Sequence, residues 1–321
     1  MMTRTKIAIT MASLFCGLAL STPASATPGL ALDSTKLAPP SRATLRSNID
    51  KARLADPAAF HDVREIVLHA READKKSRGR KAPNSLQLAG LGTKALMPML
   101  ELVAFDASSF ASVPGASAGD ADARADRASV ARDLIEAIGL LKDARSMPVL
   151  VAILERDSDA LTTRTAAEAV ARMDSDEAAN ALVANLEKAT GERATAILAG
   201  MGSCHRTLVA RTLADRLAAH PDDATARAII KSLGHVGSAW AWKTLSDRSE
   251  EAASRETAAR ALVNAYVHYG SDAREAAAKA LLVVDDAHTT TFMEAARRGA
   301  PADTALALDE LARRFASNPT H

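Results

Sequence analysis

The feature that most constrains the fold is a helical pattern that recurs along the chain. In residues 138–154, "IGLLKDARSMPVLVAIL", one apolar run ends at a polar Lys-Asp and a second apolar run follows. Before this turn, apolar side chains recur at three- and four-residue steps, at Val130, Leu134, Ile135, Ile138 and Leu141. This spacing predicts an amphipathic helix, and Asp143 can cap a second helix after the turn. The stretch therefore predicts a helix, a tight turn and another helix.

Similar patterns occur in six other segments, at residues 88–103, 163–189, 192–217, 224–245, 254–284 and 291–315. From Gly139 onwards their turns lie roughly 28 to 36 residues apart, a period typical of repeat proteins. Alanine makes up about a fifth of the chain and allows helices to approach closely. One helix pair cannot bury both of its apolar faces, so we expect successive pairs to stack into an elongated, all-α core.

The unit at residues 135–154 carries a family resemblance. Its pattern I-x-x-I-G-x-L-x-D-x-R-x-x-P-x-L-x-x-x-L resembles a HEAT-type repeat, in the short form also found in phycobilisome lyases. Tetratricopeptide repeats have a similar period, but their Trp, Gly and Tyr signature is missing. In the unit at 163–189, Asp174 stands where the HEAT family usually has glycine. The resemblance implies a right-handed α-solenoid whose second helices line a concave face, and a non-enzymatic scaffold that binds a protein partner there.

The N-terminus predicts export. Arg4 and Lys6 precede an apolar run at residues 7–20, and small residues at 24–26 suit a signal peptidase site. The apolar run is shorter than the roughly 20 residues of a membrane span. Lipid attachment at Cys16 is a less suitable alternative, because bulky Phe15 precedes it. We expect a periplasmic or secreted protein with no integral membrane segment after cleavage.

These patterns divide the chain. We expect a signal peptide at 1–26, a flexible leader at 27–45, N-terminal capping helices with a basic loop at 46–84, and a HEAT-like solenoid at 85–321. A low-complexity insertion at 107–127 interrupts the solenoid. It is long for a helix–helix connection, so it is either disordered or a docking loop.

Charge limits the possible partners. The chain has 40 basic and 39 acidic residues, and loss of the signal peptide would leave a net charge of about −1. Such a chain has no overall attraction to nucleic acid. The loop "KKSRGRK" contains the local basic cluster Lys75, Lys76, Arg78, Arg80 and Lys81. This cluster is either solvated surface or a contact with an acidic partner, and a tether to the cell envelope is an alternative function.

Two short motifs suggest chemistry but lack its structural context. "GASAG" at 115–119 matches the nucleophile pattern around Ser117, yet no strand precedes it. "GLGTKA" at 90–95 matches a dinucleotide-binding form, yet it lies in helical repeat sequence. We therefore predict no catalytic residue and no cofactor, with a lyase-like enzyme accessory as the alternative.

The cysteine and histidine pattern also predicts no reactive or metal centre. Cys204 would be the one cysteine of the mature chain, so it is a free thiol or forms an intermolecular disulfide. Its neighbour His205 would point about 100° away on a helix, which disfavours a nucleophile–base pair. No histidines have the spacing of a common metal motif.

The predicted partner contacts lie in the later repeats. Trp240 and Trp242 are two residues apart, so at most one should enter the core, and an exposed tryptophan is often a binding hot spot. The full predicted set is Trp240, Trp242, Lys243, Arg206 and Arg211.

Overall fold

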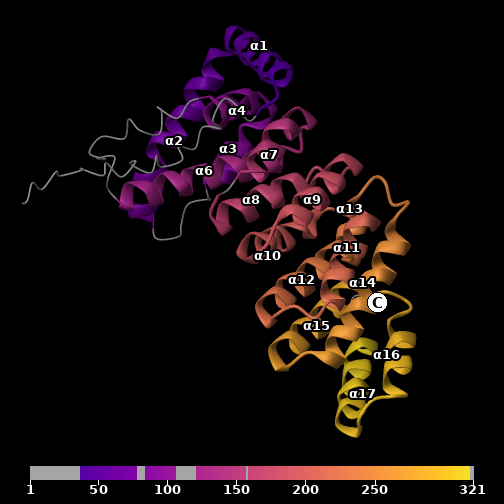
Figure 1. Cartoon of the computed structure of the whole chain (residues 1–321). Helices are drawn as coiled ribbons and strands as arrows, with labels where there is room; N and C mark the ends of the chain where they lie inside the picture. The colour runs from indigo at the N-terminus through magenta and orange to yellow at the C-terminus, as the bar shows by residue number, and fades with distance from the viewer. Residues whose placement is uncertain (1–36, 78–83, 106–120, 157, 319–321) are drawn as a thin grey trace, which may run out of the picture.

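The computed structural model describes residues 37–77, 84–105, 121–156 and 158–318, except for the side chains of 70–77 and 121–127. These residues form helices and connecting turns without a strand (Figure 1). The α-helices are α1 (Pro39–Ala55), α2 (Pro57–Ser77), α3 (Asn84–Gly90), α4 (Leu96–Ala104), α6 (Ala121–Leu141), α7 (Met147–Leu154), α8 (Ala160–Ala171), α9 (Asp176–Lys188), α10 (Gly191–Gly200), α11 (Thr207–Ala218), α12 (Asp223–Val236), α13 (Ala239–Thr244), α14 (Glu251–His268), α15 (Ser271–Val284), α16 (Thr289–Arg297) and α17 (Ala302–Ala316). Three 3-10 helices, η1 (Gly92–Ala95), η2 (Ala144–Ser146) and η3 (Met201–Ser203), join paired helices. The predicted all-α solenoid is confirmed.

The helices stack in two rows. The first row contains α3, α6, α8, α10, α12 and α15, each packed against the next. The second row contains α7, α9, α11, α14 and α16, again in sequence. Leu134, Ile138 and Leu150, from the unit first recognised in the sequence, are all fully buried between the rows. Each helix pair therefore buries its apolar faces against its neighbours, as expected for a solenoid.

The start of α7 follows the sequence prediction. Asp143 accepts a hydrogen bond from the Arg145 backbone N–H at 3.0 Å and so caps η2, the turn that leads into α7. Pro148 lies in the first turn of α7, where its missing N–H breaks no helical hydrogen bond. These two residues fix where the second helix begins.

Glycine permits close contact within the first row. A Cβ added to Gly139 of α6 would lie 2.7 Å from the Ala169 Cα of α8. A Cβ added to Gly200 of α10 would lie 2.5 Å from the Ala167 Cβ on the same helix α8. Neither distance leaves room for a side chain, so glycine at these positions sets the spacing of successive repeats.

The helix pairing differs from the sequence prediction after α12. We expected α14 and α15 to be the first and second helices of one unit, at residues 254–284. The two helices do form a packed helix–turn–helix, but α14 also packs beside α11 in the second row, and α15 packs beside α12 in the first. The short helix α13 follows α12 directly, so the next long helix of the second row is α14. Local periodicity identifies helices but not the row to which each belongs.

Two predicted boundaries also change. Helix α1 begins at Pro39, so residues 39–45 of the expected flexible leader are helical, with proline at a position that favours helix initiation. Helix α6 begins at Ala121, inside the expected insertion at 107–127. The predicted signal peptide and the rest of that predicted insertion lie outside the described residues. No helix in the described ranges is long and apolar enough to cross a membrane.

Candidate binding groove

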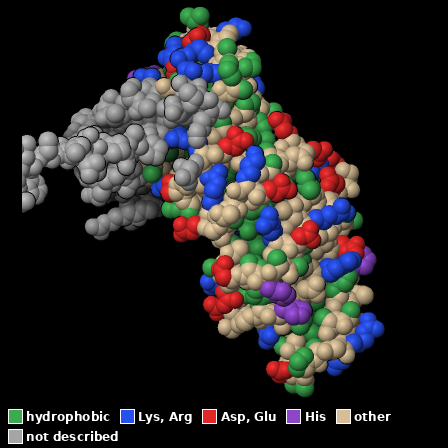
Figure 2. All heavy atoms as spheres, in the orientation of Figure 1, with side chains coloured by type: hydrophobic (Ala, Val, Ile, Leu, Met, Phe, Trp, Pro, Cys, Tyr) green, Lys and Arg blue, Asp and Glu red, His purple; other side chains and the backbone are tan. Residues whose placement is uncertain are grey.

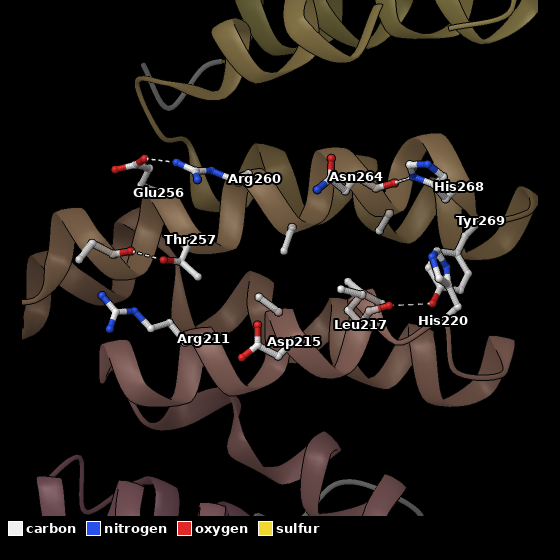
Figure 3. Close-up of a pocket in the computed structure, with 15 residues that line it drawn as sticks. Arg211, Asp215, Leu217, His220, Glu256, Thr257, Arg260, Asn264, His268 and Tyr269 are labelled. Carbon is white, nitrogen blue, oxygen red and sulfur yellow. Dashed lines mark hydrogen bonds and ion pairs between the residues drawn. The ribbon is translucent and has the colours of Figure 1, made fainter. Parts of the chain in front are cut away.

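A groove runs between α11 and α14, two adjacent helices of the second row (Figure 3). Its volume is about 480 Å³. Small side chains line it from both helices: Ala214 and Ala218 on α11, and Ala261 and Ala265 on α14. Each pair is spaced four residues apart and so lies on one face of its helix. The groove exists because alanine leaves space where larger side chains would fill it.

Charged side chains line one half of the groove. Arg211 and Asp215 extend from α11 toward the gap between the helices, and Glu256 and Arg260 lie along α14 (Figure 3). Arg260 donates to Glu256 at 2.5 Å. No hydrogen bond or ion pair of the Arg211 or Asp215 side chain is seen within the described part of the chain. One cation and one anion are therefore available to a bound molecule.

Aromatic and imidazole side chains line the other end of the groove. The Tyr269 hydroxyl donates to the Leu217 carbonyl at 3.1 Å and thereby ties α14 to α11. Burial, together with the carboxylates of Asp223 and Asp222, raises the pKa of Tyr269, so its phenol stays protonated. The exposed rings of His220 and His268 lie beside it, with centroids 6.0 Å apart.

A polar junction joins the turns of three successive repeats, and it includes Arg206. Arg206 donates to the Asp174 carbonyl at 2.7 Å and to the Glu250 carboxylate at 3.3 Å. Glu250 also accepts from the Thr207 backbone N–H at 2.7 Å. Arg206, predicted as a partner contact, thus already has partners inside the chain.

Asp174 explains why this unit can lack the usual glycine. Its backbone has φ of 49°, in the left-handed region that Asp tolerates better than most residues. Its carboxylate accepts from the His205 backbone N–H at 2.6 Å and lies 3.3 Å from the His205 Nδ1. Burial acts to raise the pKa of Asp174, but the hydrogen bonds and charge of His205 outweigh burial, and the pKa is lowered.

The two tryptophans face opposite ways. Trp242 is 1% exposed, its Nε1 donates to the Val236 carbonyl at 2.9 Å, and its ring meets His205 edge-to-face at 5.5 Å. Trp242 is therefore a core residue, and its predicted role as a partner contact is wrong. Trp240 is 75% exposed, and Lys243 is exposed on the same short helix.

Cys204 is a free, fully buried cysteine. Burial raises the pKa of its thiol to about 12, so almost no thiolate exists at neutral pH. The neighbouring His205 ring lies against Asp174 rather than acting on the thiol. The predicted alternative of an intermolecular disulfide would require this part of the core to open.

Other predicted features lie partly outside the described residues. They include Ser117 and the basic residues Arg78, Arg80 and Lys81, as well as the side chains of Lys75 and Lys76. The sequence at 90–95 forms the end of α3 and η1 and follows a helix rather than a strand. In the described ranges, no group of three or more His, Cys, Asp or Glu side chains is placed to hold a metal ion.

The fold is an α-solenoid with a groove between two of its second-row helices. Residues 122–202, from within α6 to within η3, match the family model of HEAT repeats. The chain thus contains HEAT-like repeats, and such repeats are generally helical scaffolds for protein interaction. No curated protein matches the chain significantly.

Sequence reasoning found one groove residue, Arg211, and missed the others. His268 ends α14 and His220 follows the end of α11, so the correct row order would have brought the two histidines together. The predicted unit at 254–284 joined α14 to α15 and did not indicate that α14 also packs against α11.

Proposed function

We propose that this protein is an exported, non-enzymatic scaffold that holds an elongated segment of a protein partner in the groove between α11 and α14. The groove itself carries the proposal: it combines an alanine floor with the unpaired charges of Arg211 and Asp215. An apolar floor with a few polar groups is the usual composition of a binding site, and its volume is in the usual range.

The shape of the groove favours a chain segment. On α14 its lining extends from Ala253 to Tyr269, about 24 Å at the rise of an α-helix. An extended peptide of roughly seven residues covers that length. Over the described repeats in Figure 2, basic and acidic side chains are intermixed, which supports a partner of mixed rather than uniform charge.

Two further contacts belong to the proposal. Trp240 is a large apolar side chain held outside the core, and Lys243 is exposed one turn further along α13. A partner longer than the groove could contact both residues, with Trp240 as the apolar anchor.

Export is supported by the signal-like N-terminus, which would place the scaffold in the periplasm or outside the cell. Mass spectrometry of the protein from fractionated cells tests this part. We expect a mature N-terminus at Thr27 in the exported fraction. An intact N-terminus in the cytoplasmic fraction would contradict export but leave the groove unaffected.

Site-specific photo-cross-linking tests the groove. A benzophenone amino acid replaces Ala218 in the groove or, as a matched control, the exposed first-row residue Lys231. We expect a discrete protein adduct from position 218 and none of that mass from position 231. Exchanging the groove charges by Arg211→Glu with Asp215→Arg should reduce the adduct. Equal adducts from both positions would contradict the proposal.

A further inference from the structure

Two histidines distant in sequence meet at one end of the groove. His268 is the last residue of α14, and His220 follows the end of α11 with a left-handed backbone, φ 52°. Their ring centroids lie 6.0 Å apart and their planes are inclined by 66° (Figure 3). Both residues are exposed. Solvent and ions therefore reach both rings.

The hydrogen bond of His268 selects its metal-binding nitrogen. The Nδ1 of His268 lies 2.8 Å from the Asn264 carbonyl oxygen. A carbonyl can only accept, so Nδ1 carries the proton and Nε2 of the neutral ring carries the lone pair. Metal-binding histidines are commonly oriented by a bond of this kind from their other nitrogen.

His220 is held in place without using its ring nitrogens. Its ring lies against that of Tyr269, with centroids 6.1 Å apart, and Tyr269 is fixed by its hydroxyl bond to the Leu217 carbonyl. No hydrogen bond or ion pair of the His220 ring occurs among the described residues. Its nitrogens are therefore available to a ligand.

The surroundings favour a cation. Asp222 and Asp223 begin the next helix, and both carboxylates lie close enough to Tyr269 to add to the effect of burial in raising its pKa. Negative charge near Tyr269, whose ring lies against that of His220, lowers the free energy of a divalent ion bound there.

We propose that His220 and His268 together bind one divalent transition-metal ion such as Zn²⁺, with water or a partner's side chain in the remaining positions. A Zn–N bond is about 2.0–2.1 Å, so two imidazoles that share an ion have centroids roughly 5 to 6 Å apart. The observed separation of 6.0 Å lies at the upper end of this range. Imidazole suits Zn²⁺, Cu²⁺ and Ni²⁺ and is a poor ligand for Mg²⁺. The ion links α11 to α14 and closes this end of the groove.

Calorimetric titration of the full mature chain with zinc chloride tests the site. We expect one equivalent to bind, at least tenfold weaker binding in His220→Asn and in His268→Gln, and no binding of magnesium. Asn tolerates the left-handed backbone at position 220, so both variants should fold. His69→Ala is the matched control, because His69 makes the same bond to a carbonyl four residues earlier, at 2.8 Å.

Thermal melting supplies a second readout. Zinc should raise the melting temperature of the wild type and of His69→Ala, because the ion joins two repeats in the folded state alone. It should not do so in His220→Asn or His268→Gln. Zinc binding of unchanged affinity in a variant that carries both His220→Asn and His268→Gln, or no binding by the wild type, would overturn the proposal.

Discussion

Replacing Gly200 with alanine should destabilise the protein, although alanine is the better helix former. An added Cβ would lie 2.5 Å from the Ala167 Cβ, 2.8 Å from the Arg164 carbonyl oxygen and 2.9 Å from the Glu168 nitrogen. Two of these atoms belong to the backbone of α8 and cannot rotate away. The helix preference of alanine contributes at most about 1 kcal/mol, whereas overpacking costs about 1–3 kcal/mol.

Because the clash is mainly with backbone, we expect the upper part of that range and a net loss of about 2 kcal/mol. Urea unfolding followed by circular dichroism measures the change. Gly90→Ala is the control, since nothing lies within 4 Å of its added Cβ, and it should change stability by no more than about 0.5 kcal/mol. A Gly200→Ala protein as stable as the wild type would refute the close packing of α10 on α8.

Three further outcomes follow from the repeat core and its polar junction. Trp242→Ala should lower the free energy of unfolding by about 3–5 kcal/mol, whereas Trp240→Ala should change it by less than about 0.5 kcal/mol, as measured by urea unfolding. The lowered pKa values of Asp174 and Glu250 stabilise the fold above their unfolded-state pKa values of about 4, so the urea midpoint should fall as pH drops from about 5 to 3. A thiol reagent at pH 8 should label Cys204 in denaturant but not in the native protein, because its thiol is buried and its pKa is about 12; rapid native labelling would contradict this.

Much of the fold could be predicted because repeat proteins are stabilised by contacts between neighbouring helices. The apolar spacing around Ile138 and the cap at Asp143 are local signals, and both appear in the structure. The row to which each later helix belongs could not be predicted in the same way. It depends on how the burial of Trp242 fixes α13, and this tertiary contact cannot be inferred from the apolar periodicity of the sequence.

The groove could be predicted only in part for the same reason. Arg211 and Arg206 look alike in sequence, yet Arg206 is held by Asp174 and Glu250 whereas Arg211 faces open space. The space itself arises from which alanines of α11 and α14 face each other. Predicting which alanines face each other requires knowing that α14 packs against α11, and local sequence patterns do not show this.

Hydrogen–deuterium exchange of the complex with the cross-linked partner tests the proposed function most directly. The groove account predicts that the partner slows exchange mainly in α11 and α14, while first-row helices α10, α12 and α15 exchange as in the free protein. Protection confined to the first row, or a complex with no added protection in α11 and α14, would contradict it.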